Sequence, residues 1–382
     1  MGLPKYSVAE GVRTLGSGLL MAGGMVIAAV MPCKVQACTS WMVFSDLTTD
    51  GNHILHKNRD SASRKIVVAC NASDSQRKWI ALGSGSANAG INSSGLAACM
   101  NSGEKCIDPP NVEGKKATTA ILRHILASCD TSAQAVEKLK SFITAGDYSH
   151  GSSGSIFLFL DNKEGYICEI TAKVCSVQRY DKGFAVRANI WRNPGMHMNS
   201  RSAVDIYLKG CSREYIATSG LNNIIDRQGK IALLDIFELS RNYRMQEKSP
   251  FKRSICGKTT NSAATIEIDK QYPGFLSTAY FTVGHPRHTV YIPIPVCAVK
   301  LHPFMQQLKW SSASFNRLDK LSLDAPVPDE WIKFEKESIA EYASAKTKAR
   351  KLLNEGKQDE AVKLLNSTAV KIWKKAAKLL NI

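Results

Sequence analysis

The order of strand-like and helix-like stretches predicts an α+β fold whose layers form one large domain. Strand-like runs come in blocks instead of alternating singly with helices, which favours layers of sheet and helix. The chain has 382 residues, of which 44% are hydrophobic and 22% charged, so it can bury a large core and has a globular composition. We expect the domain to cover 38–325, followed by a helical segment at 326–382.

Residues 1–37 have the layout of a secretory signal peptide. Lys5 and Arg13 precede the apolar run LGSGLLMAGGMVIAAVM, and Val35 and Ala37 are small residues at the expected cleavage site. A permanent membrane anchor is one alternative, and the glycines of the apolar run argue against it. A lipid anchor on Cys38 is a second alternative. We therefore expect maturation by signal peptidase, a periplasmic or extracellular protein, and no membrane span after processing.

Strand-like runs dominate two blocks of the remaining chain. The Asp50–Gly51 pair favours a hairpin turn early in the first block, and a second turn is expected around Ser93 and Ser94. The predicted strands are CTSWMVFSD, HILHKNRD, the hairpin AGINSSGLAACMNSG, GSIFLFLD, GYICEIT, VCSVQRY, FAVRAN, AATIEID, STAYFTVG and TVYIPIPV.

Helical spacing separates these blocks. Apolar residues recur at helical intervals over 118–128 and 133–142, with Ser132 as the expected cap of the second helix, and 201–245 is predicted to be mostly helical. The segment 326–382 contains two amphipathic helices rich in Ala, Lys and Glu. These helices are expected to dock on the main body or to mediate self-association in a homo-oligomer.

The chain is basic, with a formal charge of +17 at pH 7. The charge is spread along the sequence without a dense basic run or a nucleic-acid-binding motif, so we expect no nucleic-acid partner. The positive balance favours an anionic substrate.

Cysteine usage is informative because an exported chain enters an oxidising compartment. Nine cysteines follow Cys38, an odd number, so at least one of them stays unpaired. Cys168 with Cys175, and Cys99 with Cys106, are candidates for disulfides. No Cys/His spacing typical of zinc occurs, so we expect no metal site and no cofactor.

Cys38 becomes the first residue of the mature chain if the leader is cut after Ala37. Such a residue carries a thiol and an α-amine, whose pKa of about 7.7 to 8.0 leaves a neutral fraction near pH 7. The amine can take the thiol proton directly or through a water, so one residue supplies both nucleophile and general base. A buried structural cysteine is the simpler interpretation, and Cys38 alone does not decide between them.

The return strand HILHKNRD brings charged residues back to the beginning of the first strand. Asp60 is expected to orient the α-amine, and a neighbouring cation, Lys57 or Arg59, to favour the thiolate. Strand alternation puts Lys57 and Arg59 on one face and Asn58 and Asp60 on the other. A charged surface turn is the alternative.

Several stretches resemble one protein family in the same order along the chain. These are CTS at the processed terminus, DGNHILHKNRD, GINSSGLAACMN, GSIFLFLDNKEGYICEI, RANIWRNPG, NSRSAVDIYL and STAYFTVGHPRHTVYIPI, over about 38–295. They are similar to N-terminal-nucleophile (Ntn) hydrolases of the acyl-coenzyme A:6-aminopenicillanic acid acyltransferase type, which are related to choloylglycine hydrolases and a family of dipeptidases. The resemblance implies a four-layer αββα sandwich.

The resemblance also implies roles for single residues at matching positions. It implies that Cys38 is the nucleophile, that Asp60 holds its amine, and that the Asn101 side chain helps to form the oxyanion hole. Asn189 in RAN is implied to lie near the nucleophile, and Arg201 in NSRS to belong to a supporting network.

One position departs from the related enzymes. Lys57 stands where choloylglycine hydrolases usually carry arginine, and lysine keeps the charge but loses the bidentate fork. Arg59 is the alternative cation for this role, with Asn58 between them as a further supporting residue.

The sequence predicts an exported cysteine hydrolase of linear amides. Thiolate attack would give an acyl-enzyme that water hydrolyses, and an amine in place of that water would make the protein an acyltransferase. A non-enzymatic exported lipoprotein or binding protein is the alternative class. The expected substrate is a small-molecule or short-peptide amide, held by loops at 61–79 and 191–199.

Overall fold

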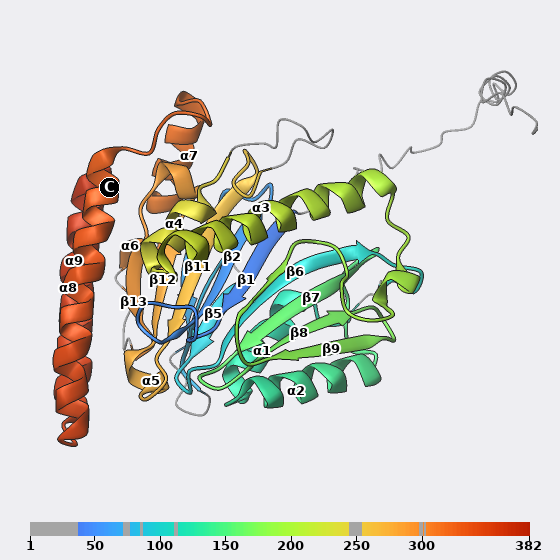
Figure 1. Ribbon diagram of the computed structural model, residues 1–382, viewed down its shortest axis with the longest axis horizontal. Helices are drawn as coiled ribbons and strands as arrows, with labels where there is room; N and C mark the ends of the chain where they lie inside the picture. The colour runs from blue at the N-terminus through green and yellow to red at the C-terminus, as the bar shows by residue number, and fades with distance from the viewer. Residues whose placement is uncertain are drawn as a thin grey trace, which may run out of the picture. The chain divides into compact units, whose positions relative to one another are not determined.

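The computed structural model describes residues 37–71, 77–84, 87–110, 114–243, 254–297, 301 and 303–382. Two antiparallel sheets lie face to face in this part of the chain (Figure 1). The first sheet has the order β10-β1-β2-β11-β12-β13, with β1 at Cys38–Val43, β2 at His53–Asp60, β10 at Phe184–Arg187, β11 at Thr260–Ile268, β12 at Thr278–Thr282 and β13 at Ile292–Pro295. The second sheet runs from β3 to β9 in sequence order, with β3 at Val67–Cys70, β4 at Trp79–Gly83, β5 at Ala89–Asn92, β6 at Ala97–Lys105, β7 at Ser153–Leu160, β8 at Gly165–Ile170 and β9 at Cys175–Tyr180.

Helices cover the outer faces of both sheets. Helices α1 (Thr118–Ser128) and α2 (Ser132–Thr144) pack on the second sheet, and α3 (Val204–Gln228) and α4 (Leu233–Ser240) pack on the first. The order helix, sheet, sheet, helix confirms the predicted four-layer αββα sandwich. Shorter elements complete the chain: η1 (Met196–Asn199), α5 (Pro273–Leu276), η2 (Pro286–His288), α6 (Pro303–Gln306) and α7 (Lys309–Lys320).

The first two strands are buried on both faces because layers lie above and below them. Met42 and Leu55 point into the core between the sheets, whereas Trp41 and Ile54 point into the core beneath α3 and α4. This alternation follows from the pleat of the strand. It means that the polar residues of β2 are buried too, and each must find partners inside the protein.

The predicted hairpin between β1 and β2 is confirmed. The strands pair antiparallel, and the register sets Cys38 opposite Arg59. Gly51 has φ +67°, a left-handed conformation that glycine adopts without a steric penalty, in the turn predicted at Asp50 and Gly51. The hairpin therefore returns the charged end of β2 to the first residue of β1.

Helix α2 begins one residue earlier than predicted. Its N-cap is Thr131, whose hydroxyl accepts a hydrogen bond from the backbone nitrogen of Gln134 at 3.2 Å. The expected cap, Ser132, is the first helical residue and donates its hydroxyl to Asp161 Oδ2 at 2.8 Å. The aspartate, which lies just beyond β7, explains why the cap moved to the preceding threonine.

Neither predicted disulfide is present, and every cysteine of the described chain carries a free thiol. Cys99 lies in β6 and Cys106 directly follows this strand, so their Cα atoms are about 23 Å apart at the usual rise of an extended chain. A disulfide needs Cα atoms within about 7 Å. Cys168 pairs across the hairpin with Val177 and lies only diagonally to Cys175, so neither pair has the geometry of a bridge.

The C-terminal helices α8 (Asp329–Asn354) and α9 (Gln358–Leu380) pack side by side against β13 (Figure 1). Trp373 donates its indole nitrogen to the carbonyl of Pro293 at 2.6 Å. Buried ion pairs add to this contact, with Lys346 on Glu267 at 2.8 Å and Arg241 on Glu335 at 2.6 Å. The structure therefore has the two C-terminal helices docked on the main body.

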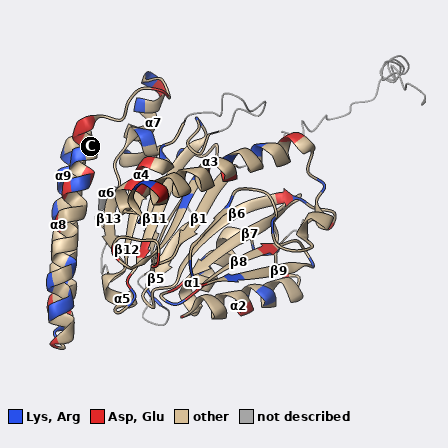
Figure 2. Cartoon of the chain, viewed as in Figure 1, with Lys and Arg blue, Asp and Glu red and all other residues tan. Residues whose placement is uncertain are grey.

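Charge is spread over the surface of these helices and less so over the sheets. Figure 2 shows Lys and Arg along α8 and α9, interspersed with acidic residues, while most of the strand surface carries neither charge. Among the described helices, none is both long and apolar enough to cross a membrane.

Candidate active site

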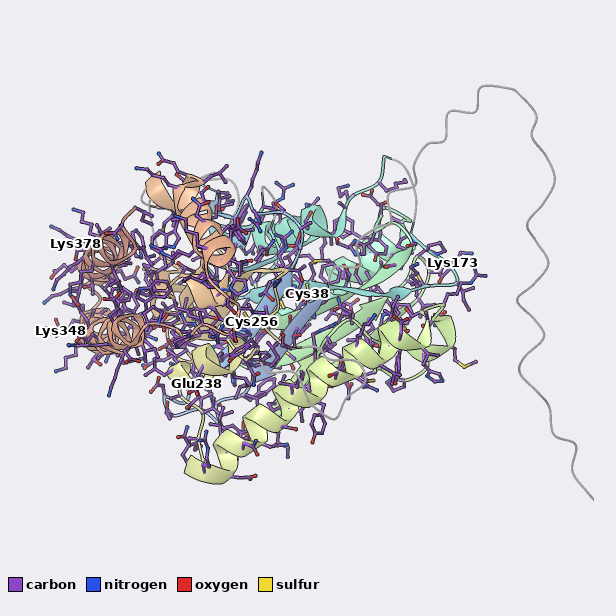
Figure 3. All side chains as sticks on the ribbon, turned by 90° about the horizontal axis from the view of Figure 1, so that it is seen from above. Cys38, Lys173, Glu238, Cys256, Lys348 and Lys378 are labelled. Carbon is purple, nitrogen blue, oxygen red and sulfur yellow. The ribbon has the colours of Figure 1, made fainter. Side chains whose placement is uncertain are left out.

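Cys38 lies in the interior, at the first position of β1, with 4% of its surface exposed. Its side chain points into the space between the two sheets, on the same face as its partner Arg59 in the register of the hairpin. Its backbone nitrogen donates to Asn189 Oδ1 at 2.7 Å. Figure 3 shows Cys38 well inside the body, in contrast to Lys348 and Lys378 on the outer sides of α8 and α9.

Asn189 lies two residues after β10, the other neighbour of β1, and its amide is held from several sides. Its Oδ1 also accepts from Arg213 Nη2 at 2.7 Å, and its Nδ2 donates to the carbonyl of Ser102 at 2.7 Å. Two donors converge on the oxygen, which fixes the orientation of the amide. The structure thus brings Asn189 next to Cys38.

Arg201, the arginine predicted for the supporting network, and Arg213 lie in different places. Arg201 is exposed and lies in the extended segment before α3, where its backbone nitrogen donates to the carbonyl of Lys105 at 2.7 Å. Arg213 on α3 is the arginine that reaches Asn189, with only 4% of its surface exposed. The structure therefore brings Arg213, and not Arg201, to Asn189, because the segment that carries Arg201 runs along the surface, and the supporting role of Arg201 stays a prediction.

The sequence contained a signal for Arg213. It stands at helical intervals from Ala217, Leu221 and Ile224, all of which are buried on the face of α3 that packs on the sheet. A charged residue in line with an apolar stripe needs an internal partner. The amide of Asn189 is that partner.

Asn101 is fully buried in β6 and uses all its hydrogen-bonding capacity. Its Oδ1 accepts from Ser40 Oγ at 2.9 Å and from Lys57 Nζ at 2.7 Å. Its Nδ2 donates to the carbonyls of Arg187 at 3.2 Å and Ala188 at 3.0 Å. An amide nitrogen has two hydrogens, so both are occupied here.

Lys57 reaches from β2 across to the second sheet. Its Nζ donates to Asn101 Oδ1 and to the carbonyl of Met100, and only 2% of the residue is exposed. It forms no ion pair among the described residues. Since Lys57 pairs with Ser40 in the register, this buried positive charge lies two positions along β1 from Cys38.

Arg59 is the second cation on the same face of β2. Its Nη2 donates to Ser84 Oγ, at the end of β4, at 3.1 Å, and 7% of the residue is exposed. Its Nε and Nη1 have no hydrogen-bond partner among the described residues. Burial lowers the pKa of Arg59, and an ionised Cys38 opposes this shift because the two side chains lie close together.

Asp60 and Asn58 lie on the other face of β2, as strand alternation predicts. Asp60 Oδ1 accepts from Thr260 Oγ1 of β11 at 2.6 Å. Asn58 donates its amide to the carbonyls of Ser240 at 2.7 Å and Ile255 at 3.2 Å, so it ties β2 to the layer that contains α4. The role of Asp60 toward an α-amine stays a prediction, whereas the contacts of Asn58 point away from Cys38.

A buried ion pair holds the segment that carries Asn189. Arg187 donates Nε to Glu169 Oε1 at 2.9 Å, and Glu169 also accepts from the backbone nitrogens of Arg192 and Asn193, each at 2.8 Å. Burial raises the pKa of Glu169, while the guanidinium of Arg187 opposes that rise. This network fixes the chain on both sides of Asn189.

Two further thiols, those of Cys99 and Cys256, lie near the charged residues of β2. Burial raises the pKa of Cys99 to about 11, and the charge of Lys57 opposes this rise. Burial likewise raises the pKa of Cys256 to about 12, with Asp60 as an additional cause. Both are therefore protonated near neutral pH and are poor nucleophiles.

Two of the apolar residues expected in the pocket wall at 191–199 are packed into the protein, whereas others in this segment, such as Met198, are exposed. Trp191 is 2% exposed and Met196 is fully buried, so both belong to the core between the sheets. A cavity of about 450 Å³ instead adjoins the loop that follows β2, and its lining includes Arg64 and Lys258. Among the described residues, no group of three or more His, Cys, Asp or Glu side chains could hold a metal ion.

Comparison with known families supports the resemblance found in the sequence. Residues 47–207 match the model of the acyl-coenzyme A:6-aminopenicillanic acid acyl-transferase family, which agrees with the resemblance predicted from the sequence. The matched segment contains Asp60, Asn101, Asn189 and Arg201, and it begins after Cys38. No curated protein matches the sequence.

Solved structures similar to this one include a bile acid hydrolase and a penicillin acylase. A variant of conjugated bile acid hydrolase from Clostridium perfringens has 13% sequence identity and a TM-score of 0.48, covering 76% of this chain and 95% of its own. Penicillin V acylase from Agrobacterium tumefaciens has 12% identity and a TM-score of 0.45, covering 68% of this chain and 86% of its own.

Proposed function

We propose that this protein is an exported cysteine hydrolase that cleaves linear amides, with Cys38 as nucleophile after residues 1–37 are removed. The observation that carries the proposal is the hydrogen bond from the Cys38 nitrogen to Asn189 Oδ1. Once the chain begins at Cys38, this nitrogen is an α-amine held in place beside its own thiol. The position of the thiol between the sheets, on the same face as two buried cations, supports the same role.

The first half of the reaction forms an acyl-enzyme. The neutral α-amine takes the thiol proton, and the thiolate attacks the carbonyl carbon of the amide. The C–N bond of the tetrahedral intermediate then breaks, and the leaving nitrogen takes the proton from the ammonium group of Cys38. The released amine departs, and the acyl group remains as a thioester on Cys38.

Asn189 suits the oxyanion better than Asn101 does. Both amide hydrogens of Asn101 are donated to main-chain carbonyls, so this side chain positions Lys57 and the segment at 187–188. The Nδ2 of Asn189 has one carbonyl partner, Ser102, and carries a second hydrogen. Directed at the substrate oxygen, such a donor stabilises the charge that develops in the transition state.

The second half of the reaction decides between hydrolysis and transfer. The α-amine takes a proton from water, the resulting hydroxide attacks the thioester carbonyl, and the thiol is regenerated with release of a carboxylic acid. If an amine attacks in place of water, the product is a new amide. The description of the matched family as an acyl-transferase favours keeping this second function as the alternative.

Burial of Cys38 weighs against a lipoprotein and bears on maturation. A lipid chain on a side chain that is 4% exposed inside β1 would have to displace the core between the sheets. The same burial hides the bond between Ala37 and Cys38 from a protease once the domain has folded. We therefore expect signal peptidase to cut during export, before folding, without self-cleavage.

The test compares exported wild-type protein with Cys38→Ala and Cys38→Ser. N-terminal sequencing and intact mass should give an unmodified chain that begins at residue 38 in all three. Turnover of N-acyl amino acids, bile-salt conjugates, dipeptides and penicillins should fall by roughly 10⁴-fold or more in Cys38→Ala. A lipid adduct on Cys38, or equal turnover by wild type and Cys38→Ala, would overturn the proposal.

A further inference from the structure

Arg59 differs from two other buried arginines, Arg187 in β10 of the first sheet and Arg241 directly after α4. Arg187 lies on Glu169 at 2.9 Å, and Arg241 lies on Glu335 at 2.6 Å. Arg59 is buried to a similar degree, with 7% of its surface exposed, but no carboxylate of the described residues forms an ion pair with it. A buried guanidinium without an acid is costly, and such a group persists where a ligand supplies the missing charge.

The unused hydrogen bonds of Arg59 lie beside the nucleophile. Arg59 stands directly opposite Cys38 in the hairpin, so both side chains emerge from the same face of adjacent strands. Its Nη2 is anchored on Ser84 Oγ, while Nε and Nη1 lack acceptors among the described residues. The anchor holds the guanidinium across the gap between β2 and the end of β4, next to the thiol of Cys38.

We propose that Arg59 binds a carboxylate of the substrate, so that the preferred substrate is an amide with a carboxylate a few bonds from the scissile carbonyl. This inference rests on the proposed function. N-acyl-α-amino acids carry such a group on the amine side, where only a nitrogen and one carbon separate the two carbonyl carbons. Half-amides of short dicarboxylic acids carry it on the acyl side.

Charge elsewhere in the site supports an anionic ligand. Lys57 is a second buried cation on the same face of β2, and its contacts are a carbonyl and the Asn101 amide oxygen. Burial lowers the pKa of Arg59, which is the direction expected of a cation that lacks a fixed counter-ion. A bound carboxylate would neutralise the positive charge of Arg59 and form charge-assisted hydrogen bonds with its guanidinium.

The first experiment measures kcat/KM for matched acid and neutral substrates. One pair is an N-acylglycine and its glycinamide analogue, and the other is a glutaric half-amide and its diamide. Wild type should prefer the acid of one pair, which identifies the side of the bond that carries the charge. Arg59→Met should lower kcat/KM for that acid by about 30-fold and leave the neutral partner within about threefold.

Two variants control this experiment. Arg227→Met removes an exposed arginine in the last turn of α3, which lies in no part of the proposed site, and it should leave the acid-to-neutral ratio unchanged. Arg59→Lys keeps the charge and should restore part of the preference. Equal losses on acid and neutral substrates in Arg59→Met, or no preference in wild type, would overturn the inference and assign Arg59 to the thiol alone.

A second experiment does not depend on turnover. Alkylation of Cys38 by iodoacetate and by iodoacetamide, followed by mass spectrometry of its peptide, compares an anionic with a neutral reagent on the mature protein. The iodoacetate-to-iodoacetamide rate ratio should fall by about tenfold or more in Arg59→Met and in Arg59→Gln. If this ratio falls but no amide is hydrolysed, the carboxylate site stands and the proposed function fails. If amides are hydrolysed and the ratio does not depend on Arg59, the carboxylate site fails alone.

Discussion

The buried polar residues on the two faces of strand β2 differ in how completely their side chains are hydrogen-bonded. On the face toward α4, both ring nitrogens of His56 and every polar atom of the Asn58 side chain have a partner. On the face toward the second sheet, Lys57 bonds only to uncharged groups, and Arg59 has two nitrogens without an acceptor among the described residues. Complete satisfaction fits a structural role, whereas an incomplete set beside a thiol indicates a place for a ligand.

The strongest test of this comparison replaces one side chain on each face of β2. Lys57→Met deletes the charge near Cys38, and kcat/KM for the best amide should fall by about 100-fold at nearly unchanged stability. Asn58→Ala leaves two buried carbonyls and His56 without their partner, and the free energy of unfolding should fall by about 2 to 3 kcal/mol. Urea unfolding and steady-state kinetics on both variants measure the two effects. Loss of stability without loss of activity in Lys57→Met would contradict the assignment of the faces.

A smaller effect should separate the two candidate arginines. Arg213→Met removes a donor from Asn189 Oδ1 and should lower kcat by about tenfold with little change in KM, because it acts by positioning the amide. Arg201→Met changes an exposed residue and should leave both constants within about twofold. Initial-rate kinetics over a range of substrate concentrations measures the split. A larger loss of kcat in Arg201→Met than in Arg213→Met would favour Arg201 as the arginine of the supporting network.

The smallest expected effect is the pH dependence of stability on the structural face. Burial lowers the pKa of His56 to about 3, whereas the unfolded chain has the ordinary value of 6.5. The unfolded state therefore binds more protons between these values, so stability is full above pH 6.5 and falls as the pH drops toward 3. Urea unfolding at pH 7.5 and pH 5.0 should show this loss, and His56→Gln should show less of it. His285, whose pKa burial also lowers to about 3, keeps part of the slope in that variant.

Much of the fold follows from sequence patterns with a local cause. The Asp50–Gly51 turn, the alternation in β1 and β2 and the blocks of strands sufficed to predict a layered α+β fold, because each rests on neighbouring residues, whereas the two facing sheets were implied by the family resemblance. The cap of α2 moved by one residue because Asp161, far along the chain, had already bound Ser132. Long-range partners of this kind leave little local trace.

The same reason explains which site residues were found. Cys38 and Asn189 were predicted from short motifs, and the structure brings them together. Arg201 was chosen from its motif, but the segment 201–203 runs along the surface, while Arg213 reaches inward from the buried face of a helix. The role of Asn101 as an oxyanion donor was plausible from its residue type, and only the four contacts around its amide argue against it.

The contacts around Cys38 join residues that are far apart in the sequence. This separation affects the stage of folding at which the site assembles. The nitrogen of Cys38 meets an acceptor 151 residues further along the chain, and Asp60 meets Thr260 across 200 residues. Contacts of such high order form late in folding, after local hairpins and helices. A partly folded chain therefore carries the thiol without the surroundings that would make it reactive. The topology delays assembly of the site until most of the polypeptide has folded.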